Sequence, residues 1–556
     1  MTDPTVPSRG TRRRGIARLG RIVAILGALC VPAPGYPTTW YVDASAAEGG
    51  NGRSWETAFR AIRAALNHAW IKDTIVVAEG TYIENIRVRG SLVLRSAEPL
   101  NPAVVANTII DGGGSGPVIE FGGEEGATCV VEGFTITNGA TLDGGGISGN
   151  GTLATIRNNI ITGNVAHGAD EAWFEDPESE WDGSGAMRGG GGIYWCNGLI
   201  ENNTISDNTT GVLTYSELVG FGGGLCRCHG AIRNNRIIRN KAQGAVWVCG
   251  PPYACLPVLA GGGGVAHCNG IIEGNYIADN TSEYDGGGLY SCGGLIQRNI
   301  IARNGADWYS GGLRGCGGWI RSNLIMANFG DGLMGCSALI ENNVIWGNSR
   351  KGISSAGSAW IRNTTITGNS KGGVAELDNG LMHNCVIWGN GGLDPAVYWT
   401  EPTYSCIQDW TGGGEGNISE DPRFVDEENG DFRLRADSPC IDAGFNSLDL
   451  PEFDIAGMHR IMFGGKSLTV DMGAYEFYIN QLEPVPGTNE TVFTWSSLAD
   501  KTYSIFYTDD PFNWHTAIAN FPSSGNQTTS WLDDGSLTGL PPSLAPRRFY
   551  RLLENP

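Results

Sequence analysis

Between residues 156 and 390 the chain repeats one short pattern of apolar and polar positions. Isoleucine recurs five positions after an apolar anchor residue, and asparagine recurs eight positions after it, in all nine segments. Short apolar runs separated by Gly and Asn predict short β-strands joined by tight bends. The nine anchors are Ile156, Ile200, Ile232, Ile272, Ile296, Ile320, Ile340, Ile361 and Met382.

The spacing of these anchors predicts how the strands are arranged. The last five anchors are 24, 20, 21 and 21 residues apart. A repeat of this length that is rich in Gly and β-branched residues is unlike the longer helical repeats. Coils stacked at about 4.8 Å pair each strand with its equivalent in the next coil. The pattern therefore predicts a parallel β-solenoid with an isoleucine core and asparagine columns whose amides bond along the axis.

Two further columns follow from the same alignment. One position after the anchor, opposite charges alternate between neighbouring coils, as in Arg233 and Glu273, which predicts an outward ladder of ion pairs. Four positions before the anchor, six coils carry cysteine. The next two coils, which are one residue longer there, carry Ala356 and Leu377 at the corresponding position, so we expect buried core thiols. Bridges between adjacent coils and a metal site are the alternatives. The six cysteines are Cys196, Cys228, Cys268, Cys292, Cys316 and Cys336.

An amphipathic segment before the repeats predicts a cap for the first coil. Over residues 56–70, apolar side chains fall on one side of a helix, and Ser54 is a suitable N-cap. These apolar residues are Phe59, Ile62, Leu66 and Trp70. We expect this helix to plug the open end of the solenoid, which would otherwise aggregate.

The patterns divide the chain into five parts. Residues 38–110 form the N-terminal cap and first coils, 111–400 the β-helix repeats, and 401–478 a terminal capping segment. Residues 479–556 alternate apolar and polar positions in short runs after a Pro-containing link, which predicts a small antiparallel β-sandwich. Residues 1–33 are the fifth part, an expected signal peptide.

The N-terminal segment has the pattern of a signal peptide. Six arginines between positions 9 and 21 precede an apolar run from Ile22 to Val31, which is too short to span a bilayer. We therefore expect residues 1–33 to be cleaved, with an uncleaved anchor as the alternative. The sequence contains no second apolar run of spanning length, so the mature form is expected to have no membrane span and to be secreted or held at the cell surface.

Composition and charge limit which binding partners and which folds are expected for this chain. The chain has 37 Lys and Arg against 58 Asp and Glu, a net charge of −21, which excludes nucleic acid as a partner. An acidic glycan would need a local basic cleft or a bound divalent cation. With 85 Gly and 25 Pro among 556 residues, a mostly helical fold is excluded. Export favours a disulfide between Cys406 and Cys440, and we expect a monomer.

Sequence motifs at both ends resemble a known group of proteins. The segments Trp40-Tyr-Val-Asp43, Asp73-Thr-Ile-Val-Val-Ala78 and Gly80-Thr-Tyr82 open the chain, and Asp421-Pro-Arg-Phe-Val-Asp426 and Asp471-Met-Gly-Ala-Tyr-Glu476 stand near its end. Together they resemble secreted bacterial right-handed β-helix proteins of the pectate-lyase-like superfamily, over residues 38–478. The resemblance implies a right-handed parallel β-helix. It points to an extracellular glycan context without fixing the activity, because this one fold hosts lyases, hydrolases, epimerases and adhesins.

Three insertions identify one candidate site. They enter early coils at one corner, at 165–188, 209–221 and 241–260, and successive loops of this kind form a wall. One residue before the cysteine column, beside this wall, lie three side chains that can act on a sugar. An arginine–histidine pair would neutralise a uronate and abstract its C5 proton, which is the chemistry of lyases and epimerases. The candidates are Trp195, Arg227 and His267, with His229 nearby; a polar surface cluster is the alternative.

The first insertion is acidic and aromatic. A carboxylate cluster of this kind can bind Ca²⁺, the one cofactor that the sequence suggests, or hold a sugar. A solvated loop is the alternative. The carboxylates are Glu175, Asp176, Glu178 and Asp182, and the aromatic residues beside them are Trp173 and Trp181.

Two tryptophan columns are a second candidate. Trp319 and Trp360 stand one position before the anchor, and Trp346 and Trp388 stand six positions after it. Each pair lies two coils apart, roughly 9.6 Å, on positions expected to point outward. Such rings can stack on alternate sugars of an extended glycan. Coverage by the C-terminal segment is the alternative.

The two hypotheses for function follow from these sites. The first and leading hypothesis is an exported β-helix protein that engages extracellular polysaccharide or a cell-surface glycan. Whether it is an enzyme stays open; if it is, the loop wall is the expected place of a uronate lyase or epimerase activity. The second is a non-catalytic surface, adhesion or structural protein. The chain lacks the Asn-Thr-Asp and Gly-His-Gly patterns of the polygalacturonase-like hydrolases and the Arg-x-Pro-x-x-Arg motif of pectate lyases, which favours the second.

Overall fold

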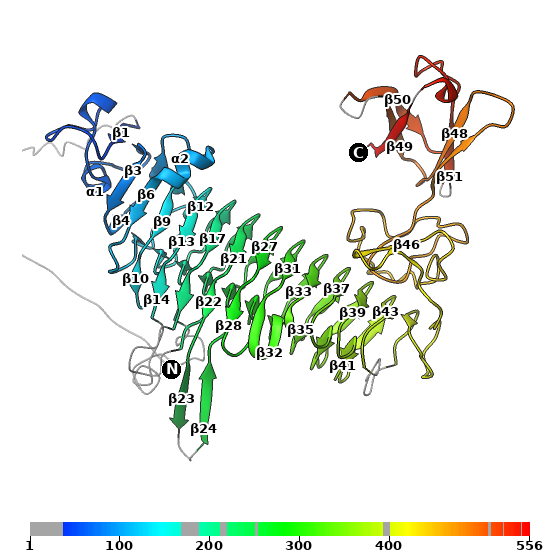
Figure 1. The fold of residues 1–556 in the computed structure, drawn as a ribbon, viewed down its shortest axis with the longest axis horizontal. Helices are drawn as coiled ribbons and strands as arrows, with labels where there is room; N and C mark the ends of the chain where they lie inside the picture. The colour runs from blue at the N-terminus through cyan, green and yellow to red at the C-terminus, as the bar shows by residue number, and fades with distance from the viewer. Residues whose placement is uncertain are drawn as a thin grey trace, which may run out of the picture. The chain divides into compact units, whose positions relative to one another are not determined.

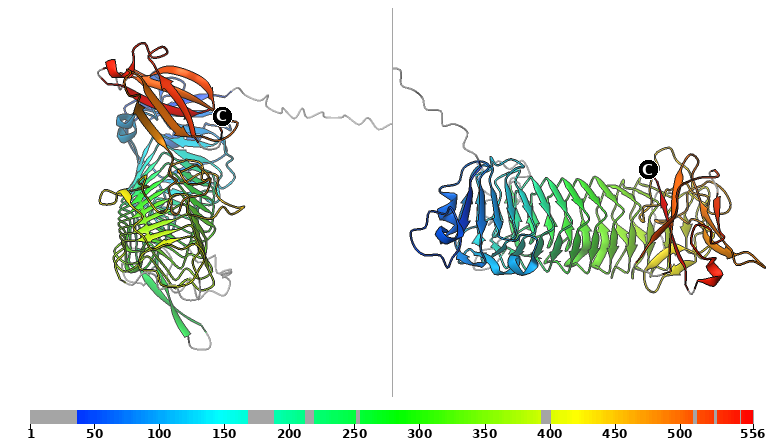
Figure 2. Two further views of the ribbon diagram at one scale, coloured as in Figure 1. Left: turned by 90° about the vertical axis from the view of Figure 1, so that its right-hand side faces the viewer. Right: turned by 90° about the horizontal axis from the view of Figure 1, so that it is seen from above.

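The chain folds as a right-handed parallel β-helix, followed by small antiparallel sheets (Figure 1). The computed structural model describes residues 37–167, 188–211, 219–250, 254–392, 401–509, 513–525, 528–545 and 547–555. The expected signal peptide, 1–33, lies outside these residues. Three long parallel sheets surround one apolar core, and the stacked coils are seen side-on in Figure 2.

The first sheet carries the anchors. Its 13 strands, in order of pairing, are β1 (Thr39–Val42), β2 (Thr74–Val77), β5 (Val93–Ser96), β8 (Val130–Glu132), β12 (Thr155–Arg157), β16 (Leu199–Glu201), β20 (Ala231–Arg233), β26 (Ile271–Glu273), β30 (Leu295–Gln297), β33 (Trp319–Arg321), β36 (Leu339–Glu341), β39 (Trp360–Arg362) and β42 (Leu381–His383).

The second sheet carries the isoleucines five positions further on. Its 13 strands are β3 (Gly80–Ile83), β6 (Thr108–Asp111), β9 (Thr135–Thr137), β13 (Ile160–Thr162), β17 (Thr204–Ser206), β21 (Arg236–Ile238), β27 (Tyr276–Ala278), β31 (Ile300–Ala302), β34 (Leu324–Met326), β37 (Val344–Trp346), β40 (Thr365–Thr367), β43 (Val386–Trp388) and β44 (Cys406–Ile407).

The third sheet is split into two rows in the early coils, and the three insertions lie between these rows. One row is β4 (Ile86–Val88), β7 (Ile119–Phe121), β11 (Ile147–Ser148), β15 (Ile193–Tyr194), β19 (Leu225–Cys226), β25 (Val265–Ala266) and β29 (Leu289–Tyr290). The other row is β10 (Ala140–Thr141), β14 (Val165–Ala166), β18 (Thr209–Thr210), β22 (Lys241–Ala242) and β28 (Thr281–Ser282). Both rows join at the long strand β32 (Gly305–Arg314), and β35 (Phe329–Met334), β38 (Ile353–Ser354) and β41 (Val374–Ala375) follow.

The register confirms the alignment of the repeats. Ile200 pairs with Ile232, and Ile205 pairs with Ile237, in neighbouring parallel strands. The anchors and the isoleucines five positions later are buried in one continuous core. Equivalent residues of successive coils therefore lie in columns along the axis, as the sequence predicts.

Buried asparagines join the coils through side-chain hydrogen bonds. The Asn203 amide donates to Asn235 Oδ1 at 3.0 Å and to the Ile156 carbonyl at 2.9 Å, and the Asn203 backbone N–H also donates to Asn235 Oδ1 at 2.9 Å. A second column behaves in the same way, with Asn208 donating to Asn240 Oδ1 at 3.0 Å. The residue with left-handed backbone is the one before each column member, such as Asn202 at φ 55°.

The charged and cysteine columns are both structural. Arg157 pairs with Glu132 at 2.6 Å, and Arg233 pairs with Glu273 at 3.1 Å, on the outer face of the first sheet. The six cysteines of the column are free and buried, so the core interpretation is correct and the bridged alternative is wrong. Cys226 lies beside this column without belonging to it. Burial raises the pKa of its thiol well above the usual value, which keeps the thiol protonated.

The expected N-terminal helix is much shorter than predicted. A 3₁₀ turn, η1 (Trp55–Thr57), precedes a single helical turn, α1 (Ile62–Leu66), and Ser54 makes no side-chain cap hydrogen bond. Instead, the Glu84 carboxylate accepts from the N–H groups of Ile62 and Arg63 at 2.8 and 2.9 Å. Trp70, predicted on the apolar side, is 80% exposed.

A second short helix, α2 (Pro102–Asn107), lies beside the second sheet and was not predicted. The Asn101 side chain caps it by accepting from the Ala103 N–H at 3.1 Å. Val104 and Val105, in the middle of this helix, are its buried residues.

Residues 401–478, here called the covering segment, fold back over the second sheet. Its hairpin, β45 (Phe424–Asp426) and β46 (Asp431–Leu434), joins Val344 and Val386 in one apolar cluster. The Ala474 N–H donates to Thr365 Oγ1 at 3.0 Å, and the Phe445 N–H donates to Asn384 Oδ1 at 2.7 Å. The covering segment therefore packs on the last coils of the second sheet and partly buries their outer face.

The expected disulfide between Cys406 and Cys440 is not formed, because both are buried free thiols in the structure. They belong to the apolar cluster that joins the covering segment to β43 and β44. The raised pKa of Cys440 comes first from its hydrogen bond with the Cys406 side chain and then from burial. Packing, rather than a covalent bridge, therefore joins these two elements in this structure.

The C-terminal residues form two three-stranded antiparallel sheets. The first contains β47 (Asn480–Pro484), β48 (Thr491–Ser496) and β51 (Thr528–Asp533); the second contains β50 (His515–Pro522), β49 (Thr502–Thr508) and β52 (Phe549–Glu554). A 3₁₀ turn, η2 (Pro542–Leu544), precedes β52. Their shared core contains Phe493, Trp495, Tyr503, Ile505 and Trp531.

We expect Asn240→Ala to destabilise the β-helix strongly. The substitution leaves the Asn208 N–H and the Ile205 carbonyl without their buried partner, since both bond the Asn240 amide. At 1–3 kcal/mol for each buried group, the loss is about 3 kcal/mol in the free energy of unfolding. Thermal unfolding measures it, with Asn269→Ala as the control because the Asn269 side chain is exposed. Equal stability of the two variants would contradict a structural role for the buried amides.

Candidate functional site

The insertions emerge side by side from the third sheet. Their C-terminal ends pair in order, Gly189 with Phe221, Phe221 with Gly261, and Gly261 with Asp285. The third insertion forms an antiparallel hairpin of β23 (Ala245–Gly250) and β24 (Ala254–Leu259). Because these ends are neighbours, the predicted common origin of the loops is correct.

The base of these loops covers the outer face of the third sheet. Val219, Phe221 and Ala260 form one apolar cluster with Tyr194 and Cys226 from the sheet strands. The side of the sheet beside the predicted loop wall is therefore packed with apolar side chains at this level.

The three predicted side chains of this site share one backbone position. Trp195, Arg227 and His267 have φ angles of 52°, 56° and 52°, at the bend that follows β15, β19 and β25. The Arg227 guanidinium lies 5.5 Å from the centre of the Trp195 ring, and Trp195 is 38% exposed. The structure thus brings the three together, as the alignment predicts.

His267 is buried between aromatic rings. Its ring centre lies 5.1 Å from that of Phe221 and 5.5 Å from that of Tyr290, both in edge-to-face contact, and only 7% of the residue is exposed. Its Nε2 has no hydrogen-bond partner. Burial, with the charge of Arg227 second, lowers the pKa of His267 to about 4. A general base must approach its proton to hydrogen-bond distance, so this covered imidazole fits packing better than catalysis.

His229 takes part in hydrogen bonds that stabilise a bend of the chain. Its ring Nδ1 accepts from the Asn269 backbone N–H at 3.3 Å, and the His229 backbone N–H donates to Asn197 Oδ1 at 3.0 Å. Burial, and then the charge of Arg227, lower the pKa of His229. These contacts form a short ladder of side chains across three coils.

Sequence reasoning missed the acid of this cluster. Asp143 Oδ2 lies 2.8 Å from Arg188 Nη1, and Asp143 Oδ1 accepts from the Gly189 N–H at 3.1 Å. Burial raises the pKa of Asp143, while the charges of Arg188 and Arg227 oppose that shift. Tyr194, whose pKa burial also raises, completes the polar group. Asp143 precedes the nine aligned segments, so no column of the repeat identified it.

The predicted Ca²⁺ ligands lie outside the described residues. Within the part of the chain that the structure describes, no group of three His, Cys, Asp or Glu side chains could hold a metal ion. The residues outside the description are Glu175, Asp176, Glu178 and Asp182, together with Trp173 and Trp181.

The two tryptophan columns differ in their surroundings. Trp346 and Trp388 pack against the covering segment, and the Trp346 ring meets Phe432 at 5.4 Å. Trp319 and Trp360 are 49% and 50% exposed on the first sheet. The alternative, coverage by the C-terminal segment, is therefore correct for Trp346 and Trp388 and not for Trp319 and Trp360.

A cavity of about 360 Å³ lies beside Trp319. Loop residues 449–454 of the covering segment form one wall, and Arg321, Glu341 and Arg362 of the charged column line it as well. The Arg321 guanidinium lies 5.1 Å from the centre of the Trp319 ring. This place combines an open aromatic ring with polar side chains, the combination that orients a polar ring-shaped ligand.

Of the comparisons with known proteins, a match to a family model supports the fold. A family model described as a right handed beta helix region matches residues 101–251. A solved structure titled "The complex structure of XylC with xylose" is similar at 12% sequence identity and a TM-score of 0.40, covering 79% of this chain and 98% of that chain. No curated protein matches the chain. In the described residues, no helix is long and apolar enough to cross a membrane.

The buried His267 predicts an acid-sensitive fold. Because its folded pKa of about 4 lies below the ordinary 6.5, the unfolded chain takes up the proton first, so stability is lost as the pH falls from 6.5 to 4. The shift corresponds to about 3 kcal/mol. His267→Asn tolerates the left-handed backbone and removes the titration.

We therefore expect the stability of wild type relative to His267→Asn to fall by this amount between pH 7 and pH 4, as measured by chemical unfolding. His515→Asn, at an exposed position of β50, is the control and should follow the wild type. A difference between wild type and His267→Asn that is constant over this range would show that His267 titrates normally.

Proposed function

We propose that this protein is an exported, non-catalytic β-helix protein that binds an extended polysaccharide through the outer face of its first sheet. The observation that carries the proposal is the pair of half-exposed rings, Trp319 and Trp360, in one column of one face. Export is inferred from the N-terminal sequence pattern.

The tryptophans belong to an apolar stripe along the sheet. In successive coils, Trp319 pairs with Leu339, Leu339 with Trp360, and Trp360 with Leu381. Leu381 is 54% exposed at the end of this series. Contiguous exposed apolar surface of this kind is rare on a soluble protein unless it contacts a ligand or partner.

The charged column beside the stripe is already paired within the protein. Arg362 contacts Glu341 at 2.8 Å, and Arg321 lies 3.9 Å from the same carboxylate. Arg362 also pairs with Asp449, so two guanidinium groups face two carboxylates. Because these four charges neutralise one another, the face offers aromatic rings and satisfied polar groups rather than a net charge. That combination suits an extended glycan with hydroxyl groups along both edges.

The spacing of the rings matches a ligand with a repeat of two units. Rings two coils apart are separated by roughly 9.6 Å along the axis. An extended chain of sugars running along the first sheet would place alternate rings over Trp319 and Trp360. The cavity beside Trp319 would accept a branch or a substituent.

Single substitutions of the two tryptophans test the proposal. Each of Trp319→Ala and Trp360→Ala should weaken glycan binding about threefold to tenfold, because one stacking contact contributes about 0.5–1.5 kcal/mol. The double variant should bind more weakly than either. Affinity electrophoresis of the full mature chain across a panel of neutral and acidic polysaccharides measures the change.

Trp70→Ala is the matched control, because Trp70 is 80% exposed and belongs to the N-terminal cap. Equal loss of binding in this control, or unchanged binding in the double variant, would contradict the proposal. Release of unsaturated uronate products, abolished by Arg227→Ala, would establish the lyase alternative in its place.

A further inference from the structure

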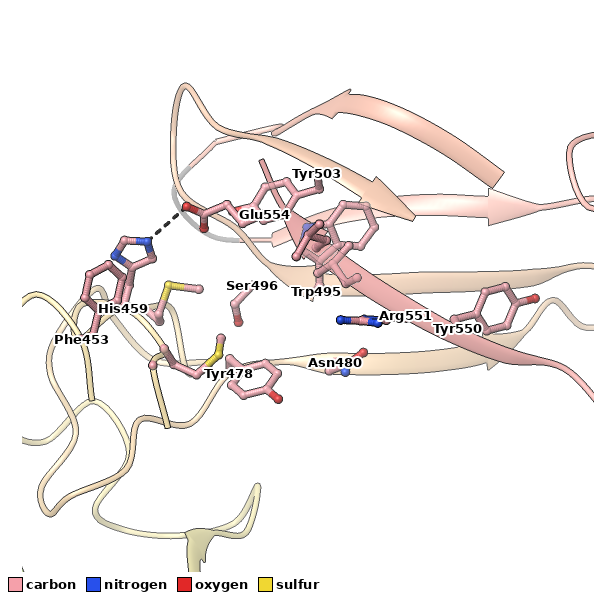
Figure 3. Close-up of a pocket in the computed structure, with 15 residues that line it drawn as sticks. Phe453, His459, Tyr478, Asn480, Trp495, Ser496, Tyr503, Tyr550, Arg551 and Glu554 are labelled. Atoms are coloured by element: carbon pink, nitrogen blue, oxygen red, sulfur yellow. Dashed lines mark hydrogen bonds and ion pairs between the residues drawn. The ribbon is translucent and has the colours of Figure 1, made fainter. Parts of the chain in front are cut away.

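A second cavity, of about 540 Å³, lies between the covering segment and the C-terminal sheets. Figure 3 shows its lining: Phe453, His459 and Tyr478 come from the covering segment, and Trp495 and Arg551 come from β48 and β52. Cavities at such junctions, of 300–1,000 Å³, are common places for small ligands.

Aromatic rings supply the apolar part of the lining. Phe453 and Tyr478 keep 41% and 37% of their surface exposed at the cavity. Trp495 and Tyr503 stand in edge-to-face contact at 5.7 Å and line it from the side of the C-terminal sheets. Rings on two sides of one cavity fit a flat ligand face.

The lining also holds hydrogen-bond donors without partners. The Trp495 indole nitrogen is buried, in a residue that is 1% exposed, and it has no hydrogen-bond partner. Arg551 makes no ion pair within the described part of the chain, and Asn480 adds an exposed amide. The Trp495 nitrogen itself is closed off by its surroundings, so Arg551 and Asn480 are the polar groups of the lining that offer donors to a ligand.

The acidic group of the lining is already engaged. Glu554 Oε1 lies 3.2 Å from His459 Nε2 and 3.0 Å from Lys501 Nζ. Its charge is therefore compensated, which leaves the Arg551 guanidinium as the charge available to a ligand. Guanidinium and carboxylate groups form paired, charge-assisted hydrogen bonds.

We propose that this cavity binds a sugar ring that carries a carboxylate, with the carboxylate on Arg551, the apolar ring face on Tyr478 and a hydroxyl group on the Asn480 amide. This site is separate from the tryptophan stripe and goes beyond the proposed function. It provides the local basic group that an acidic sugar needs on a chain of net charge −21.

Calorimetric titration of the full mature chain tests the site with three probes. A galacturonic acid trisaccharide should bind, and the neutral galactose trisaccharide, which lacks the carboxylate, should bind at least tenfold more weakly. Acetate, which lacks the ring, should not bind measurably. Equal affinity for the acidic and neutral trisaccharides, or no binding of the acidic one at millimolar concentration, would overturn the proposal.

Variants locate the binding. Arg551→Gln should weaken binding of the acidic trisaccharide about tenfold, because it removes a charge-assisted pair. Arg547→Gln, a nearby exposed arginine outside the lining, should leave it unchanged. Trp319→Ala should also leave it unchanged, which separates this site from the stripe. An unaltered affinity in Arg551→Gln, with an unchanged unfolding temperature, would contradict the assignment.

Discussion

Hydrogen bonds between buried side-chain amides are the interaction on which this structure depends. Each coil must turn sharply between its sheets, and the turn takes backbone groups away from the strand ladders. The Asn235 amide and its equivalents satisfy these groups inside the core and also bond the next coil. A buried polar group without a partner is costly, so the amide columns also fix the register in which coils stack.

That register determines where the variable parts of the chain can go. Since Gly189, Phe221 and Gly261 pair in sequence, three insertions of different length return to one place on the third sheet. Their bases cover that sheet with Phe221 and its neighbours, and this packing buries His267. A position that looks catalytic in sequence is therefore part of the attachment of the loops.

The covering segment decides which outer surface stays open. It packs on the second sheet and is held there by a buried arginine, Arg460, whose Nε donates to Asn342 Oδ1 at 3.1 Å and whose Nη1 lies 3.6 Å from Glu476. Loop 449–454 reaches only the border of the first sheet, where it contacts Arg362. The first sheet keeps its tryptophans exposed, and a separate cavity forms where the covering segment meets the C-terminal sheets.

The sequence by itself determined the solenoid, its register and its columns, because a repeat of about 21 residues with invariant Ile and Asn positions admits one stacking. It also identified the charged column as structural and the cysteines as core. It could not determine the extent of α1, where Glu84 from a later strand supplies the cap, or the state of Cys406 and Cys440. Trp319 and Trp346 look alike in sequence, since both alternate outward from the same core. Only the tertiary structure separates them, because the covering segment is distant along the chain and its packing on the second sheet follows from contacts that no local pattern contains.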